Sequence, residues 1–442
     1  MDSTWSGELI AAAKTLSDYC TSSDSLHQSA SSPHSRPSDR IEEAIEARRK
    51  ILSIASRLQT TLLANPADLI QQLSGQLQLL ACLKWLSEFQ VLACIPLHNS
   101  LLIKEVADVA GVPEQQLRRV MRAVATVGIL HEPQAGYIAH TPLSAQFVTN
   151  LRNLDAVTFL ASTVAPTALH MAQATGRPGS SSNKNKSAYA ILSETGSSFL
   201  DDCKQNPRLQ RQWTAFWQCG ADSSEEIVLA LTALNWRALG TAKVVDVCAD
   251  SVKPAESLIA VYPSLQMTVQ LNSEVVLSPP KVKADSNRNG RQEVTLENRL
   301  PGTPQPITDA AVYILRFAGL WSDMSACILA ELNIHLAILA ANQSRTLLLA
   351  PPLLPEHGQA VGPELEAKAR LQDLCLHQLT NDGAALELSD LVDLVISVHD
   401  HRGSLIVVNR LHSNKTAAVI ALAVKYAPYP DLSATTLLSD LS

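Results

Sequence analysis

The chain has 442 residues, of which 46% are hydrophobic and only 17% are charged. Because globular proteins carry about 25% charged residues on average, this composition predicts that much of the surface is buried, in a large core and also in a subunit interface. The formal net charge of −7 argues against binding of nucleic acid by bulk electrostatics, which requires a basic face.

Eight cysteines are scattered along the chain, with no C-x-x-C pair and no spacing typical of zinc ligands. Such usage is typical of reduced, buried thiols in an intracellular protein, so we expect no metal site. Residues 1–16 lack the basic start and the apolar run of a signal peptide. No uninterrupted apolar stretch is long enough to span a bilayer, so we expect no membrane association.

The N-terminal part is expected to begin with a flexible segment over residues 1–39. Residues 1–19 could form one short helix, and Thr21–Asp39 is rich in serine and too poor in apolar residues to fold. From Arg40 onward, isoleucines and alanines recur at helical spacing to about Leu63.

A second helix is expected to begin at Pro66. It leads into Leu77–Leu92, a stretch that is apolar on most sides and is therefore expected to be buried in a core or against another subunit. Arg48, Arg49 and Lys50 form a basic triplet, which we interpret as a solvated helix face rather than a nuclear import signal.

Residues 98–148 have the pattern of a winged helix-turn-helix. One helix covers Ile103–Ala110, Gly111 makes the turn, and a second helix follows Pro113. Two short strands around Gln134–Gly136 form the wing. Together with the preceding helices, this motif predicts a mostly helical dimerisation domain over residues 40–150.

The rest of the chain divides into a helical connector over residues 151–235, interrupted at Gly176–Ser187, and an α/β domain over residues 236–442. Strands alternate with helices in the α/β domain, which predicts a parallel, Rossmann-like sheet with covering helices. The expected strands are Lys243–Cys248, Gln266–Leu271, Ala310–Leu315, Arg345–Leu349, Ser404–Asn409 and Ala417–Tyr426, and the last two could pair as a hairpin. The expected helices are Ala255–Tyr262 and Met324–Asn342, and Lys281–Gln292 is expected to be a surface insertion.

This order of domains resembles the plan of plant and fungal small-molecule O-methyltransferases. The resemblance rests on Lys243–Val247, which is similar to the strand of the cofactor motif, on Tyr262–Leu265, on Tyr313–Arg316 followed by Trp321–Asp323, and on Gln378–Gly383. It implies a winged-helix domain for dimerisation and a Rossmann-like domain that binds S-adenosylmethionine.

The chain departs from that family where the cofactor should bind. The family places a glycine-rich loop after the first strand, because only glycine lets the backbone come so close to the ligand. Here the loop reads Cys248, Ala249, Asp250, Ser251 and Val252, and no glycine occurs between Gly240 and Gly290. The acidic residue that binds the ribose is replaced by Leu271, beside the uncharged Gln270 and Asn272. We therefore expect no cofactor.

The catalytic base of the family is also missing. The resemblance places a His-Asp pair just before Trp321, where the histidine would take the proton of the substrate hydroxyl. This chain reads Phe317-Ala318-Gly319-Leu320-Trp321, and none of these side chains can take a proton. His335 lies in an expected helix and is interpreted as a packing or surface residue. We expect no catalytic residue and no enzymatic activity.

A closer resemblance is carried by Leu80–Leu97 and by Val106–Arg119. Both stretches are similar to the methyltransferase-like co-activators of fungal aromatic polyketide gene clusters, of the aflatoxin-pathway and anthraquinone type. The resemblance implies a regulator in the nucleus that helps a zinc binuclear-cluster transcription factor to switch on the cluster genes. It also implies a homodimer.

Two other functions stay open. The chain could be an O-methyltransferase with a degenerate but working cofactor site, since fold does not settle function. It could instead be a winged-helix DNA-binding regulator, because Arg118, Arg119 and Arg122 lie on the helix that would enter the major groove. The acidic net charge and the lack of further basic residues in the wing argue against direct DNA contact, and leave the three arginines as a candidate interaction surface.

Overall fold

In the computed structural model of the protein, the described residues are 3–24, 37–62, 65–175, 187–193, 196–220, 231, 234–249, 251–271, 294–317, 323–355, 363–381, 385–412 and 419–430. The chain divides into two compact units, Met1–Leu80 and Ala81–Ser442. The expected insertion 281–292 and the helix interruption from Gly176 to residue 186 lie outside the described residues.

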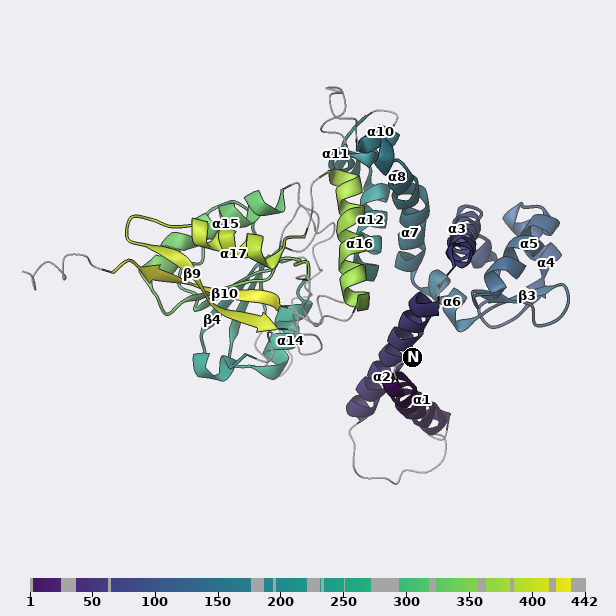
Figure 1. Ribbon diagram of the computed structural model, residues 1–442, viewed down its shortest axis with the longest axis horizontal. Helices are drawn as coiled ribbons and strands as arrows, with labels where there is room; N and C mark the ends of the chain where they lie inside the picture. The colour runs from purple at the N-terminus through teal and green to yellow at the C-terminus, as the bar shows by residue number, and fades with distance from the viewer. Residues whose placement is uncertain are drawn as a thin grey trace, which may run out of the picture. The chain divides into compact units, whose positions relative to one another are not determined.

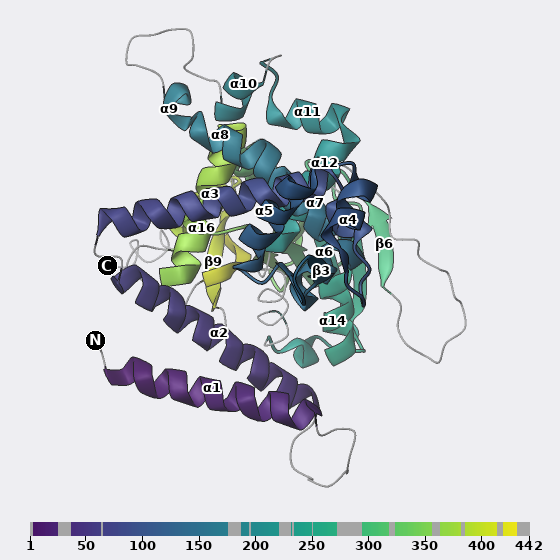
Figure 2. The ribbon, with the colours of Figure 1, turned by 90° about the vertical axis from the view of Figure 1, so that its right-hand side faces the viewer.

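The first unit is built from α1 (Ser3–Asp24), α2 (Pro37–Leu62) and the start of α3 (Pro66–Glu88). Helices α1 and α2 pack side by side (Figure 2). The Arg57 guanidinium of α2 lies over the Trp5 ring of α1, 4.7 Å from its centroid. Helix α1 covers most of the short helix expected over residues 1–19. The unfolded linker expected over Thr21–Asp39 was wrong for 21–24 and 37–39, where contacts between the two helices stabilise what the local composition alone would not.

Helix α3 is largely exposed in the single chain. The stretch Leu77–Leu92 was expected to be buried in a core or against another subunit, and in the single chain Leu86 is the one described residue of α3 that is fully buried. Burial against another subunit stays a prediction. The 3₁₀-helix η2 (Val91–Cys94) follows α3 and buries Val91 and Leu92. Most of α3 therefore presents apolar side chains on its surface.

Residues 98–150 hold the elements of the predicted helix-turn-helix and wing, in the predicted order. Helix α4 (Ile103–Ala110) ends at Gly111, whose φ of +67° glycine adopts readily, and α5 (Glu114–Ala125) follows. A three-stranded antiparallel sheet has the order β1-β3-β2, and its strands are β1 (Leu101–Leu102), β2 (Leu130–His131) and β3 (Tyr137–His140).

A helical region follows and packs around an aromatic cluster formed by Phe159, Phe199, Trp213 and Phe216. A helix from much later in the chain, α16 (Pro363–Thr380), packs beside it and adds Leu376 and Leu379 to the cluster (Figure 1). The helices of this region are α6 (Pro142–Thr149), α7 (Leu151–Phe159), the π-turn η3 (Leu160–Val164), α8 (Ala165–Leu169), α9 (Met171–Ala174), α10 (Ala188–Leu192), α11 (Phe199–Gln205) and α12 (Pro207–Gly220).

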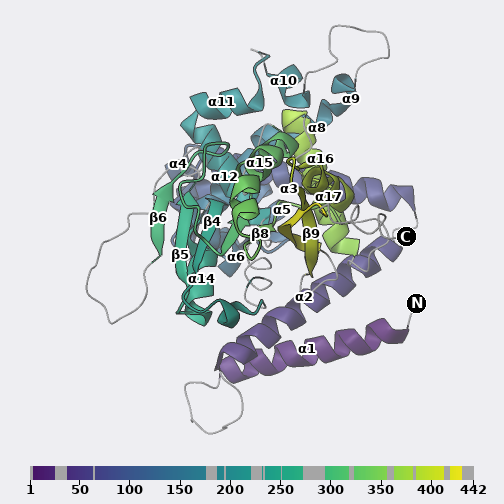
Figure 3. The same cartoon turned by 90° about the vertical axis from the view of Figure 1, so that its left-hand side faces the viewer.

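The C-terminal part is a seven-stranded sheet in the order β6-β5-β4-β7-β8-β10-β9 (Figure 3). The pairs among β6, β5, β4, β7 and β8 are parallel, and β9 and β10 form an antiparallel hairpin at one edge. The strands are β4 (Lys243–Ala249), β5 (Gln266–Leu271), β6 (Thr295–Asn298), β7 (Val312–Leu315), β8 (Thr346–Leu349), β9 (Gly403–His412) and β10 (Val419–Pro428).

Helices cover both faces of the sheet, as the alternation of strands and helices predicts. Helices α15 (Met324–Ala341) and α17 (Leu388–Ser397) pack on the face that carries Val245 and Val247. Helix α14 (Lys253–Val261) and the turn η4 (Trp236–Leu239) pack on the opposite face. Among the described helices, α15 is the one long and apolar enough to cross a membrane, but it buries Glu331 and His335 and packs in this core.

Candidate functional site

The strand order places a topological switch point between β4 and β7. The chain leaves β4 toward β5 and β6 on one side, and then returns to β7 and β8 on the other side. In open sheets of parallel strands, ligands bind outside the carboxyl ends of the strands at such a point. The carboxyl ends of β4 and β7 are therefore the candidate site.

An ion pair bridges this switch point. Arg316, which follows β7, donates from Nε and one terminal nitrogen to the two carboxylate oxygens of Asp246 on β4, at 2.9 and 2.8 Å. It also donates to the carbonyl oxygen of Ser251, at 3.1 Å. The side chains are only 4% and 2% exposed. A guanidinium thus lies between the strand ends and joins both strands to the loop after β4.

The backbone turns sharply beside this pair. Cys248 has a φ of +57° and Phe317 a φ of +49°, and both side chains are buried. Non-glycine residues adopt this left-handed region at a cost of about 1 kcal/mol each. The pairing of β4 with β5 also shifts register between Asp246 and Ala249. The loop therefore keeps a glycine-type conformation at Cys248 without a glycine.

The Cys248 thiol is chemically inert in this environment. Burial, and secondarily the negative charge of Glu331, raises the pKa of Cys248 far above its ordinary value. The thiol stays protonated at neutral pH, and a protonated thiol is a poor nucleophile. Ala249 is fully buried beside it, Val252 is partly buried, and Asp250 lies outside the described residues.

The end of β5 offers no carboxylate of its own. Leu271 is buried, and Gln270 is fully buried and exchanges two hydrogen bonds with the Gln305 amide, at 2.7 and 2.9 Å. The nearest acidic group on the adjacent strand is Glu297, whose carboxylate accepts from the Gln270 amide at 3.4 Å. Asn272 lies outside the described residues.

A second buried ion pair lies behind β6. Arg299 donates to both carboxylate oxygens of Glu331 on α15, at 3.0 and 3.1 Å, and the Gly302 amide donates to the same carboxylate at 2.7 Å. The side chains are 4% and 0% exposed. Buried polar side chains of the protein therefore bond to one another next to the ends of β5 and β6.

His335 is a packing residue, as one of the two sequence interpretations held. It is fully buried on α15, its Nδ1 bonds to the carbonyl oxygen of Glu331 at 2.8 Å, and its ring stands edge-on to Tyr313. Burial lowers the pKa of His335, so the ring is neutral at pH 7. Phe317 is buried, and residues 318–321 lie outside the described residues.

The three arginines of α5 do not form one free basic face. Arg118 is paired with Glu114, and Arg122 is paired with Glu132, which directly follows β2, at 3.2 Å. Arg119 is exposed. Two of the three charges are therefore already paired within residues 98–148.

The loop after β4 and the end of β5 lie at one edge of the sheet, since Ala249 pairs with Leu271. Neither Arg316 nor Asp246 was assigned a role from the sequence. The sequence did carry a signal that these two charges are buried, because Asp246 and Arg316 each directly follow apolar strand residues. A charge in such a position must be paired to be buried.

A family model described as the N-terminal domain of the trypacidin cluster transcriptional coactivator tpcD matches residues 3–64. A transcriptional coactivator of Pseudocercospora fijiensis is 48% identical over 353 residues, which cover 80% of this chain and 97% of the relative. The monodictyphenone cluster transcriptional coactivator mdpA of Emericella nidulans is 39% identical, over 96% of this chain and 98% of its own length.

Solved structures share the fold at low sequence identity. The mitomycin 7-O-methyltransferase MmcR has a TM-score of 0.60 at 18% identity, over 84% of this chain and 99% of its own. LepI in complex with SAM has a TM-score of 0.63 at 15% identity, over 94% and 100% of the two chains. These likenesses place the chain on the O-methyltransferase fold, while its sequence relatives are regulators. The chain belongs to the family of transcriptional coactivators of fungal secondary-metabolite gene clusters.

Proposed function

We propose that this protein is a catalytically inactive coactivator that acts by contact with a zinc binuclear-cluster transcription factor in the nucleus. The observation that carries the proposal is the ion pair between Asp246 and Arg316 at the switch point. The pair lies at the carboxyl ends of β4 and β7, where ligands bind in open sheets of parallel strands, and we expect its buried guanidinium to disfavour S-adenosylmethionine, which is itself a sulfonium cation. The Gly-free loop and the absence of the His-Asp pair from the sequence support the same conclusion.

The proposal includes a homodimer formed through residues 40–150. Helix α3 exposes Leu69, Ile70, Leu73 and Leu77, which are between 46% and 66% exposed. An exposed helix surface this apolar is typical of a subunit interface. Helices that carry apolar side chains on most sides are normally covered in the functional assembly.

The experiment is a reporter assay with a promoter from the cognate gene cluster. We expect the zinc-cluster activator alone to give weak transcription, and the activator together with this protein to give several-fold more. A coupling free energy of about 1–3 kcal/mol shifts an equilibrium roughly 5- to 150-fold, so weak contact is sufficient. Tagged protein should also retain the activator on a column. Unchanged transcription together with no retention would rule the proposal out.

Two observations favour an O-methyltransferase as a second candidate. Cys248 keeps the left-handed conformation of a glycine loop, and the Glu297 carboxylate lies within hydrogen-bond distance of Gln270 at the end of β5. Binding of S-adenosylmethionine with methyl transfer to a phenol would support this candidate. The DNA-binding alternative predicts binding to duplex DNA that weakens steeply with salt and depends on Arg119.

A further inference from the structure

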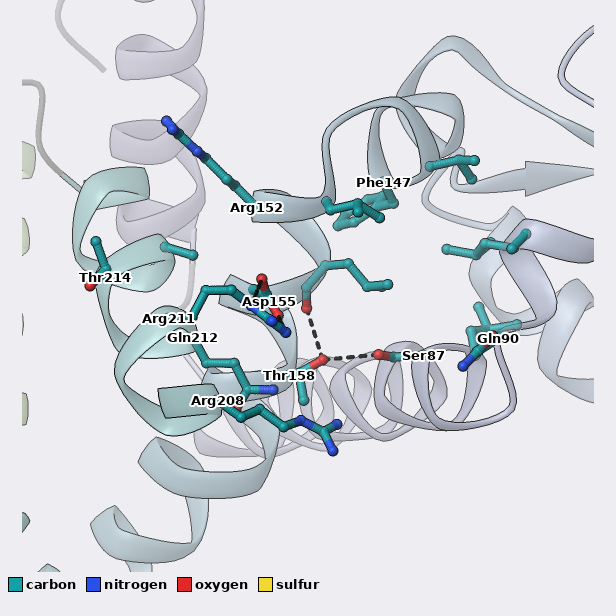
Figure 4. A pocket seen from close by; sticks show the side chains of 17 residues that line it. Ser87, Gln90, Phe147, Arg152, Asp155, Thr158, Arg208, Arg211, Gln212 and Thr214 are labelled. Atoms are coloured by element: carbon teal, nitrogen blue, oxygen red, sulfur yellow. Dashed lines mark hydrogen bonds and ion pairs between the residues drawn. The ribbon is translucent and has the colours of Figure 1, made fainter. Parts of the chain in front are cut away.

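A cavity of about 790 Å³ lies in the helical part of the second unit, away from the switch point. It is enclosed by the end of α3 and by helices α6, α7 and α12 (Figure 4). Its volume falls within the range of about 300–1,000 Å³ that is typical of small-molecule sites. The walls are mainly apolar and include Leu86, Leu92, Phe147, Leu151 and Leu154.

The charges around the cavity favour an anion. Three arginines and one aspartate line it, although the whole chain carries a formal net charge of −7. Arg211 is neutralised by Asp155, with two hydrogen bonds of 2.8 and 3.0 Å. Among the residues that the structure describes, the Arg208 guanidinium has no side-chain or backbone partner, and neither has that of Arg152.

The polar groups on one wall are incompletely satisfied. The Thr158 hydroxyl donates to the carbonyl oxygen of Leu154 at 2.8 Å, so the Ser87 hydroxyl, at 2.9 Å, must donate to Thr158. Ser87 Oγ is left with lone pairs that can accept a hydrogen bond from a ligand. Gln212 is only 8% exposed, and within the described part of the chain its amide has no partner.

Figure 4 shows how these side chains converge. Arg208 and Gln212 project from α12 toward Thr158, whereas the Arg152 guanidinium points away from it. The Gln212 amide has no partner among the residues that the structure describes, so it is free to bond to a ligand in the cavity. We infer that this cavity binds an apolar organic acid with a hydroxyl group, whose carboxylate pairs with Arg208 and whose hydroxyl group reaches Gln212 and Ser87. The inference does not depend on the proposed function.

The test is calorimetric titration of the full chain with 3-hydroxy-2-naphthoate and, separately, with its uncharged methyl ester. We expect saturable binding of the acid below about 1 mM and binding of the ester at least tenfold weaker. Arg208→Gln and Gln212→Leu should each weaken acid binding about tenfold or more, because hydrogen bonds to charged groups are the strong ones. Arg119→Gln, at an exposed position that does not line the cavity, is the matched control and should stay within twofold of the wild type.

Ala93→Trp, at an exposed position on the cavity wall, should abolish binding while the melting temperature is kept. No saturable binding by folded wild type would overturn the inference. So would equal binding of acid and ester, or equal losses in Arg119→Gln and Arg208→Gln, since both indicate non-specific attraction. Binding that appears only when dimers dissociate would assign the cavity to a second copy of the chain instead. S-adenosylmethionine should not compete with the acid for this cavity, so the test of the cavity and the test of the switch point give independent results.

Discussion

Asp246 and Arg316 are 70 residues apart in the sequence, yet their side chains make two hydrogen bonds in the interior. Neither residue could be assigned this role from the sequence, because the contact exists only when β4 and β7 are neighbours in the sheet. The lost glycine loop, in contrast, could be read from the sequence, because glycine is required there for its backbone alone. The loss of the glycine loop could therefore be predicted from the sequence, whereas the ion pair between two distant positions could not.

Arg316→Ala should lower the free energy of unfolding by about 3–5 kcal/mol, because it leaves the Asp246 carboxylate buried without a partner. The double variant Asp246→Leu/Arg316→Met should lose much less, since it removes both charges and keeps apolar volume. Urea denaturation measures both. Lys243→Gln, in the exposed pair with Asp309, is the control and should have little effect. Equal losses in the single and double variants would contradict this account of the pair.

Thiol labelling tests the assignment of Cys248. Burial keeps its thiol protonated, so iodoacetamide should leave Cys248 unmodified in the native protein at pH 7.5. The exposed Cys219 should react readily, and both should react in urea. Mass spectrometry of the peptides gives the extents. Rapid native labelling of Cys248 would mean that the loop after β4 is open.

At the scale of elements, local pattern was a good guide to the sheet. Strand β5 occupies the predicted residues, and the predicted β4, β7, β8, β9 and β10 differ only at their ends. Strand β6 is a short polar segment, and α16 and α17 carry weak local signals, so none of the three was predicted. The single chain leaves most of α3 exposed, and burial against another subunit stays a prediction, since an apolar pattern does not say which molecule covers it.

Helix α15 makes the stability depend on pH. Burial lowers the pKa of His335, whereas the same ring titrates near 6.5 in the unfolded chain. The unfolded chain therefore binds the proton first as the pH falls, so the free energy of unfolding should fall below about pH 6.5. One such group gives a limiting slope of about 1.4 kcal/mol per pH unit.

His335→Gln should make that slope shallower between pH 6.5 and pH 5. Some slope should remain, because burial also lowers the pKa of His140. Urea denaturation at a series of pH values gives the comparison. A slope identical to that of the wild type would mean that His335 is not neutral in the folded protein.

Helix α3 should hold two copies together. Leu73→Glu/Leu77→Glu places two carboxylates on the exposed apolar face and should convert a dimer to a monomer, because each buried leucine contributes about 1.5–3 kcal/mol. Sedimentation velocity measures the change. Leu169→Glu, at a position that is 80% exposed and outside residues 40–150, is the matched control. A monomeric wild type would contradict the dimer.

At the scale of the whole molecule, the chain keeps the O-methyltransferase fold and carries two buried ion pairs near the carboxyl edge of its sheet. One joins β4 to the residue after β7, and the other joins the residue after β6 to α15. The order of the motifs along the chain predicted the fold, since each motif is local. Which side chains meet at the carboxyl edge of the sheet depends on which strands are neighbours, and only the three-dimensional structure reveals that.

The measurement that tests the central claim most directly is calorimetric titration of the full chain with S-adenosylmethionine and, separately, with S-adenosylhomocysteine. Because Arg316 and Asp246 bridge the switch point, we predict no heat of binding and no rise in the melting temperature at about 1 mM of either ligand. Saturable binding at about 10 µM would contradict the account. It would mean that the Arg316 guanidinium leaves Asp246 to admit the ligand, and that the chain retains a cofactor site.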